Sequence, residues 1–202
     1  MNAIARALSV ALHPLFMPTY TFVLALYFDR SLSYFLDERV HWMMVGMVAL
    51  MTIAFPMTST ALLIRAGLVR SWEMPSRQER IAPYTMTLLY YGMIWYLLAR
   101  TALHPAAILL FGGSFAALLI TALITLRWKI SAHMVGIGGC LGALAALRIL
   151  HMLPIIIPIM VLIIVAGALG TARLLTSDHS PAQIYAGTAI GFACTFVSIF
   201  WI

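Results

Sequence analysis

The stretch PIIIPIMVLIIVAGALGTA, residues 154–172, contains no charged side chain. A helix that crosses the hydrocarbon core of a bilayer needs about 20 mostly apolar residues. The stretch therefore predicts a membrane-spanning helix, and Pro154 stands where helices tolerate proline, near their first turn.

Six further apolar runs accompany it, separated by short connections. In chain order, the seven expected spans cover residues 7–28, 41–68, 83–99, 105–126, 133–150, 154–172 and 181–202. The third run is the weakest, because five tyrosines and tryptophans make it resemble a short, tilted helix rich in interface aromatics. The expected fold is all-α: a polytopic transmembrane bundle of six to seven spans, forming one integral membrane domain over residues 1–202.

The composition excludes most other classes of protein. Hydrophobic residues make up 63% of the 202 residues and charged residues 9%, against about 45–50% and about 25% in soluble domains. A soluble enzyme, a disordered regulator and a secreted disulfide scaffold are all excluded. The net charge is +6, but the basic residues stand singly at the ends of apolar runs. We therefore expect contact with membrane lipids or a small anion and no nucleic-acid partner.

Seven crossings divide the connections between two membrane faces. Face A, as we call it, receives the N-terminus and residues 69–82, 127–132 and 173–180; face B receives residues 29–40, 100–104 and 148–152. Face A holds eight Lys and Arg residues and face B four. Four of the eight are candidates for ligand binding, so the charge asymmetry leaves the orientation open. The expected location is a membrane of the bacterial cytoplasmic type.

Three polar stretches that are far apart in sequence meet on face A. They read RSWEMPSRQERIAP (70–83), KISAH (129–133) and ARLLTSDHSPAQ (172–183), and carry five cations and two histidines. A charge near hydrocarbon is costly, about 2.5–3.5 kcal/mol at the bilayer centre. Guanidinium groups match the oxygens of phosphate, and two histidines add a nucleophile and a proton donor. The stretches thus predict an active site for a phosphate compound at one membrane face.

These residues resemble the type 2 phosphatidic acid phosphatase superfamily of membrane lipid phosphatases. Its motifs are commonly written KxxxxxxRP, PSGH and SRxxxxxHxxxD. The second resembles ISAH (130–133), and the third resembles ARLLTSDHSPAQ, which keeps Arg173, five intervening residues and His179. The first is looser: Arg70 and Arg77 keep the spacing, whereas Arg80 with Pro83 is a competing alignment.

The resemblance implies a role for each matched residue. His179 would be the nucleophile that becomes a phosphohistidine, and His133 the acid that protonates the leaving oxygen. Gln183 would accept the ring proton of His179, from the position where the family has aspartate. The phosphate ligands would be Arg77, Arg80, Arg70, Ser131 and Arg173. No metal or other cofactor is implied, and the substrate would be a lipid phosphate or an isoprenoid diphosphate.

Three departures from the motifs leave alternatives open. The proline of the first motif, the glycine before His133 and the aspartate at Gln183 are missing. Hydrolysis of a phosphate monoester or diphosphate of a lipid, phosphatidic-acid-like or polyprenyl, is the leading function. The alternatives are a lipid phosphotransferase of the same superfamily and a non-catalytic protein that binds or transports lipid phosphates.

Several other residues have a structural interpretation. We interpret Arg127 and Lys129 as interface anchors beside Trp128, and the run GIGGCLG (136–142) as helix packing. His13 lies near Pro14 in the first span, where a kinked helix or the lipid entrance of a pocket are both possible. The three histidines His41, His104 and His151 belong to face B, away from the site.

Overall fold

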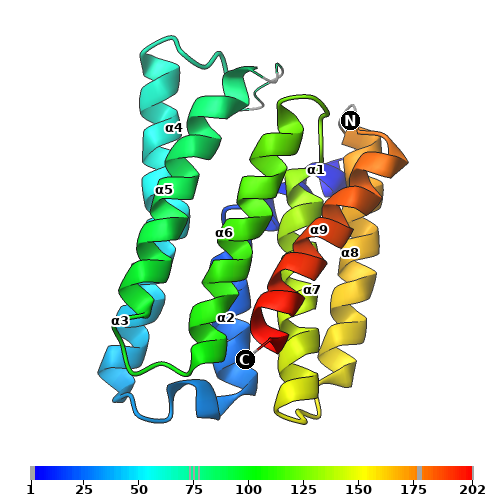
Figure 1. The fold of residues 1–202 in the computed structure, drawn as a ribbon. Coiled ribbons are helices and arrows are strands. Elements are labelled where there is room, and N and C mark those ends of the chain that lie inside the picture. The colour runs from blue at the N-terminus through cyan, green and yellow to red at the C-terminus, as the bar shows by residue number, and fades with distance from the viewer. Residues whose placement is uncertain (1–2, 73, 75, 77, 177–178, 202) are drawn as a thin grey trace.

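The computed structural model describes residues 3–72, 74, 76, 78–176 and 179–201. All regular secondary structure in this part of the chain is helical. The α-helices are α1 (Ala3–Ala11), α2 (Met17–Phe28), α3 (Glu38–Ala49), α4 (Phe55–Arg65), α5 (Ile81–Leu98), α6 (Pro105–Thr125), α7 (Ala132–Leu150), α8 (Ile156–Thr176) and α9 (Pro181–Phe200). They form an elongated bundle (Figure 1).

Five helices are long and apolar enough to cross a membrane. They are Glu38–Arg65, Pro105–Thr125, Ala132–Leu150, Ile156–Thr176 and Pro181–Phe200. The expected all-helical membrane architecture is thereby confirmed. The 18-residue helix α5 is not among the five, in keeping with the aromatic residues that weaken this run. Helix α2 is apolar but has 12 residues, a length of about 18 Å.

The first expected span, residues 7–28, is wrong as a continuous helix. Helix α1 ends at Ala11 and α2 begins at Met17. Pro14 has no N–H to donate and its ring opposes a continuing helix, so the chain leaves the helix between the two. Backbone bonds from His13 to Val10 and from Phe16 to His13 close tight turns there. The segment from Ala3 to Phe16 therefore does not extend α2.

A proline also shapes the next helix. Residues Glu38–Arg65 form one helical rod of 28 residues, in which a π-helical turn, Leu50–Ala54, joins α3 to α4. Pro56 cannot donate to the carbonyl of Thr52, four residues earlier, and such local misfits in the hydrogen-bond ladder are accommodated by a wider turn. The side-chain hydroxyl of Thr52 contacts the hydroxyl of Thr19 on α2 at 2.7 Å, which links this turn to α2.

Helix α7 lies at the centre of the bundle and packs most closely against α9. A Cβ atom at Gly191 would lie 2.0 Å from the carbonyl oxygen of Val135, and one at Gly138 would lie 2.3 Å from that of Thr188. No side chain fits at either position. Gly138 and Gly142 belong to the run interpreted above as packing, and in lipid such small residues let two helices approach closely.

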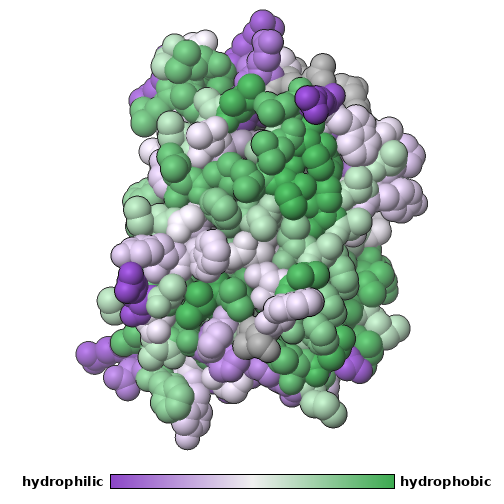
Figure 2. Space-filling model, in the orientation of Figure 1, coloured by the Kyte–Doolittle hydropathy of each residue, from purple (hydrophilic) through white to green (hydrophobic). Residues whose placement is uncertain are grey.

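The connections sort to the two ends of the bundle as the alternation of spans requires. In Figure 1 the α4–α5, α6–α7 and α8–α9 connections and the N-terminus lie at the upper end. This end corresponds to face A. Figure 2 shows a largely hydrophobic surface between the two ends, with strongly hydrophilic residues mainly toward them.

A compact polar cluster ties the face B end together. Asp29 follows α2 and is 4% exposed; it accepts hydrogen bonds from the backbone N–H of Ser31 at 3.1 Å and from its hydroxyl at 2.6 Å. The Nδ1 atom of His151, at the end of α7, contacts the same carboxylate. The ring of His104 packs edge-on against that of His151, with centroids 5.1 Å apart. We refer to these four residues as the Asp29 cluster.

Candidate active site

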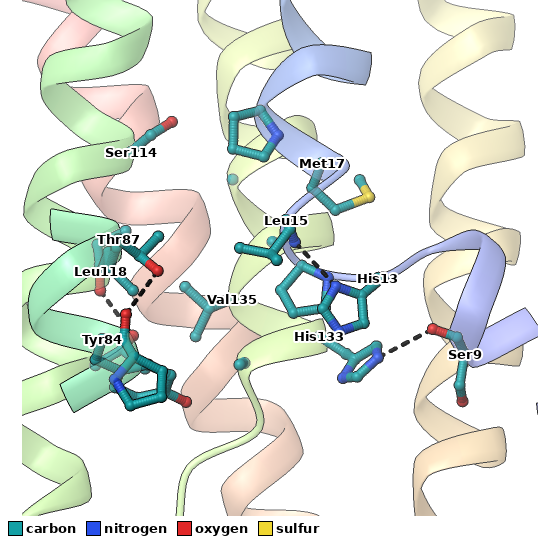
Figure 3. Close-up of a pocket in the computed structure, with 18 of the residues that line it drawn as sticks. Ser9, His13, Leu15, Met17, Tyr84, Thr87, Ser114, Leu118, His133 and Val135 are labelled. Carbon is teal, nitrogen blue, oxygen red and sulfur yellow. Dashed lines mark hydrogen bonds between the residues drawn. The ribbon is translucent and has the colours of Figure 1, made fainter. Parts of the chain in front are cut away.

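A cavity of about 610 Å³ opens among the helices at face A. One wall comes from α5 and α6, and the facing wall from α7 and the N-terminal segment, as Figure 3 shows. The α8–α9 region closes it through Arg173, Thr176 and His179. Residues from most parts of the chain thus line one cavity.

The end of the cavity toward face A is cationic. Four basic side chains line it, from α1, the short 3-10 helix Gln78–Arg80, the α6–α7 connection and α8: Arg6, Arg80, Lys129 and Arg173. None of the described residues that line it is acidic. Arg80 is positioned by its own loop, since its Nε donates to the carbonyl of Met74 at 3.1 Å. Basic side chains gathered around one cavity are suited to an anionic ligand.

His179 lies at the edge of this charged region, where the chain enters α9. His179 is 9% exposed, and its Nδ1 atom is 3.1 Å from Oε1 of Gln183. The backbone N–H of Ser180 donates to the same Oε1 at 3.0 Å. Because a backbone N–H can only donate, it identifies this end of the Gln183 side chain as the oxygen. Nδ1 of His179 must then carry the proton, which leaves the lone pair on Nε2.

The surroundings keep this imidazole neutral. Burial lowers the pKa of His179, and the charges of Arg173, Lys129 and Arg80 lower it further, against the hydrogen bond with Gln183, to about 4. At neutral pH the ring is therefore a neutral base with a free lone pair, which is the form that can attack phosphorus.

The helix start fixes both partners of this contact. Ser180 caps α9, and Ser180 and Gln183 form a capping box in which each side chain bonds to the other's backbone. Pro181 occupies the first turn, where its missing N–H costs nothing. The sequence HSPAQ thereby holds the histidine and the glutamine one helical turn apart on the same side.

His133 lies in the first turn of α7 and lines the same cavity. Its Nε2 is 3.1 Å from the carbonyl oxygen of Ser9 in α1. The ring of His13 approaches it edge-on, with centroids 5.5 Å apart and an interplanar angle of 79°. His133 and His179 thus line the same cavity from the starts of α7 and α9.

The structure brings together some of the residues expected from the sequence. His179, His133, Arg80 and Arg173 line the cavity, and Gln183 contacts His179 from outside its lining. Arg77 lies outside the described residues.

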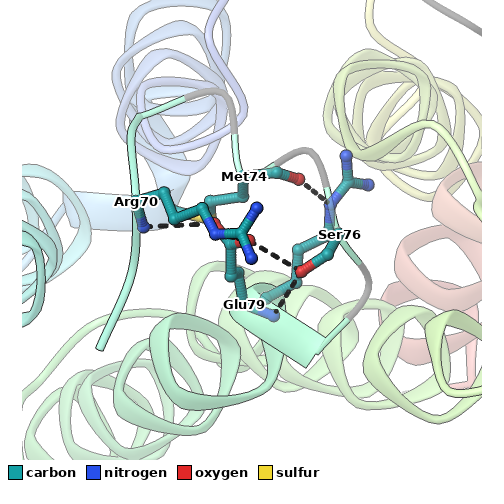
Figure 4. A network of polar contacts seen from close by, with 5 residues as sticks. Arg70, Met74, Ser76 and Glu79 are labelled. Carbon is teal, nitrogen blue, oxygen red and sulfur yellow. Dashed lines mark hydrogen bonds and ion pairs between the residues drawn. The ribbon is translucent and has the colours of Figure 1, made fainter. Parts of the chain in front are cut away.

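Two other expected phosphate ligands lie away from the cavity lining. The side chain of Arg70 is 84% exposed and its Nε is 3.7 Å from Oε1 of Glu79; Glu79 also accepts from Ser76 (Figure 4). Ser131 is fully buried at the start of α7, where its N–H donates to the carbonyl of Gln183 at 3.5 Å. Its hydroxyl has no hydrogen-bond partner within the described part of the chain.

Three residues of the cavity were not assigned to the site from the sequence. Lys129 was interpreted as an interface anchor, yet it lines the cavity with Arg6 and Tyr84. The position of Lys129 two residues before Ser131 was a usable signal, because it belongs to the same short connection. Arg6 and Tyr84 carried no such signal, since only the folding of α1 and α5 against α7 brings them near.

The cavity continues from the charged rim into the apolar bundle. Along α7 its lining extends from His133 to Cys140, about 10 Å along the helix axis. Hydroxyls on this wall are satisfied by backbone carbonyls: Thr21 donates to Met17, Thr87 to Pro83 and Thr121 to Ala117, each at 2.7 Å. The inner wall therefore presents mainly methyl groups and other weakly polar surface.

Among the described residues, no group of three or more His, Cys, Asp or Glu side chains is arranged to hold a metal ion. Comparisons of the chain with protein-family models, with curated proteins and with solved structures found no match.

Proposed function

We propose that this protein is an integral membrane phosphatase that hydrolyses a phosphate monoester or diphosphate of a lipid through a phosphohistidine on His179. One observation carries the proposal. A neutral imidazole with its lone pair on Nε2 borders a cavity that has basic side chains but no described acidic one in its lining. The resemblance of the ISAH and RxxxxxH stretches to the type 2 phosphatidic acid phosphatase superfamily supports the same chemistry.

The reaction would proceed in two balanced steps. In the first, Nε2 of His179 attacks phosphorus and the bond to the lipid oxygen breaks, while His133 gives that oxygen its proton. In the second, water attacks the phosphohistidine and gives a proton to His133, which restores both rings and releases inorganic phosphate. The hydrogen bond to Gln183 holds the other nitrogen of His179 throughout.

The cations supply what phosphoryl transfer needs most. Catalysis of this reaction depends chiefly on positioning and on stabilising the charge of the equatorial oxygens. Arg80, Arg173 and Lys129 would do this from three different segments. Arg77 and Arg70 remain expected ligands from the first motif, and Ser131 from the second. A bound phosphate also favours the charged form of His133, so substrate binding would promote protonation of the donor.

The rest of the cavity fits an amphiphile. Its charged rim lies at face A and its inner wall is weakly polar, so the headgroup would occupy the rim and part of the tail the bundle interior. We propose six to seven spans: the five long apolar helices with α5 and, across the remaining thickness, α2. Phosphatidic-acid-like lipids and polyprenyl diphosphates share this chemistry of an anionic headgroup on an apolar chain.

The test is release of inorganic phosphate by detergent-purified protein. Phosphatidic acid and a polyprenyl diphosphate are supplied separately in the presence of a metal chelator. We expect turnover, inhibition by vanadate and loss of activity in His179→Ala, with an acid-labile, base-stable phosphoryl adduct trapped on the wild type. Binding of both lipids without phosphate release or adduct formation would contradict the proposal and indicate a binding protein.

A further inference from the structure

The N-terminal segment, residues 3–16, forms part of the cavity wall instead of a span. Helix α1 packs against α8 and contributes Arg6, Ser9 and Val10 to the lining, and the break before α2 contributes His13. Figure 3 shows both Ser9 and His13 next to the ring of His133. No part of the resemblance described above involves this segment.

The carbonyl of Ser9 determines which nitrogen of His133 faces the cavity. A carbonyl oxygen only accepts, so Nε2 of His133, 3.1 Å away, must be the donor in this contact. Nδ1 is then the nitrogen left for a substrate. The partner of Nε2 is an uncharged backbone group on a short helix, whereas the catalytic histidine of other enzymes is often oriented by a carboxylate.

His13 gives the ring of His133 a second constraint. Its own orientation is fixed because its Nδ1 accepts the N–H of Leu15 at 3.3 Å, so in the neutral form its proton is on Nε2. The two rings meet edge to face at 5.5 Å, which limits rotation of His133 about the bond to Ser9. His13 is held in this place by the turn at Pro14 that interrupts the first span.

We propose that His13 is a positioning residue that holds His133 with Nδ1 toward the leaving oxygen, so that the N-terminal segment completes the active site. The inference rests on the proposed phosphatase function. Proton transfer requires the donor within hydrogen-bond reach of the oxygen, and small rotations of the ring remove that alignment. Ser9 holds one nitrogen, and His13 prevents the ring from turning around that single contact.

Leaving-group dependence distinguishes this role from a general structural one. An alkyl alcohol leaves poorly without a proton, whereas a nitrophenolate leaves readily as an anion. General acid catalysis contributes about 10²–10⁴-fold to a rate when the leaving group needs it. A misplaced donor should therefore slow an alkyl phosphate and spare a nitrophenyl phosphate of similar chain length.

The experiment measures kcat/KM of detergent-purified protein for dodecyl phosphate and for a dodecyl-substituted nitrophenyl phosphate. His13→Ala is expected to lose at least about tenfold on the alkyl substrate and less than about threefold on the aryl one. His133→Ala should show the same selective loss, and to a greater degree. The matched control is His41→Ala, a face B histidine whose ring contacts Ser33 at 3.3 Å, which should leave the ratio of the two rates unchanged.

A second variant covers the case in which alanine disturbs the fold. His13→Phe keeps the ring volume but removes both nitrogens; if His13→Ala loses activity on both substrates, a selective alkyl loss in His13→Phe supports the inference. Equal loss on both substrates in both variants, or no loss in His13→Ala, would overturn it. A wild type that hydrolyses neither substrate would instead contradict the proposed function itself.

Discussion

Two groups of histidines lie at opposite ends of this bundle, and they differ in how their charges are balanced. In the Asp29 cluster at face B, a buried carboxylate accepts from Ser31 and contacts His151, and Nδ1 of His104 accepts the N–H of Ala106 at 3.2 Å. At face A, His13, His133 and His179 line a cavity together with four basic side chains and no described acidic one.

The difference separates a structural cluster from a site. Groups that satisfy one another close the space between them and stabilise the connections that carry them. Basic side chains that line a common cavity create a positive potential in it, which favours an anionic ligand. The histidines alone do not distinguish the two ends, because both ends have histidines near helix termini.

The largest expected effect comes from removing a cation of the cavity. Arg173→Gln should lower kcat/KM for a lipid phosphate by about 10²–10³-fold, the usual cost of removing one donor to a developing oxyanion. The matched control is Arg148→Gln, in the last turn of α7 near face B, which should change the rate less than about twofold. Phosphate-release kinetics of the two purified variants provide the measurement, and equal losses in both would remove the distinction between the two ends.

The second prediction concerns stability at face B. Asp29→Asn should destabilise the protein by about 1–3 kcal/mol, because a neutral amide replaces the charged acceptor of a buried hydrogen-bond network, while folded protein keeps its activity. Asp37→Asn is the control: Asp37 is exposed and its side chain makes no capping hydrogen bond. Thermal unfolding in detergent compares the two, and an unchanged midpoint for Asp29→Asn would show that the cluster carries no stability.

The pH dependence of this contribution follows from the carboxylate. Burial raises the pKa of Asp29, but hydrogen bonds from Ser31 and His151 and the charge of His151 outweigh it, so the pKa lies below its ordinary value. A group with a lowered pKa stabilises the fold above its unfolded pKa, about 3.9, and the contribution disappears as the pH falls through the folded value. The stability difference between wild type and Asp29→Asn should therefore shrink below about pH 4.

A third prediction places a carboxylate beside His179 at the cavity. Gln183→Glu adds a negative charge beside Nδ1 of His179 and should raise the pKa of His179 from about 4 by about one to three units. Carbethoxylation, which requires a neutral imidazole, reports the change when it is followed at the His179 peptide by mass spectrometry. In the wild type the reaction should persist at pH 5.5, where a histidine of pKa near 6.5 is mostly protonated. Identical pH profiles for wild type and variant would mean that position 183 does not act on this ring.

The smallest effect is expected at the edge of face B. His41→Ala removes a contact with Ser33 and a ring contact with Trp42, neither of which belongs to the Asp29 cluster. The stability change should stay within about 0.5 kcal/mol, as for other peripheral substitutions. A larger shift in the unfolding midpoint would extend the structural cluster to α3.

The sequence predicted much of the bundle because lipid imposes simple rules. Helices α6 and α9 begin at Pro105 and Pro181, where the expected spans begin. Gly138 and Gly142, expected to serve helix packing, lie where α7 packs closely against α9. A kinked helix near Pro14 was among the expectations, but a complete break between Ala11 and Met17 was not predicted, since the apolar character of residues 7–28 continues through it. A hydropathy pattern indicates which residues prefer lipid, but it does not predict the direction in which the backbone turns at Pro14.

The candidate site also has a part that the sequence predicted and a part that it did not. The spacing of His179 and Gln183 follows from one helical turn, so local sequence was enough to predict their contact. The positions of Arg70 and Ser131 outside the cavity lining were not predictable, because each depends on a loop or helix start packing against distant segments. The same holds for Arg6 and Tyr84, which reach the cavity only through the folding of α1 and α5 against α7.

The amino-acid sequence by itself determined that the chain folds in lipid as helices, and which polar stretches share a membrane face, because charge is costly in hydrocarbon and each crossing reverses the side. Tertiary structure alone decided which of those polar groups line a common cavity and which nitrogen of His133 is available. Those properties depend on contacts between segments over a hundred residues apart, such as Ser9 with His133, and no local pattern encodes them.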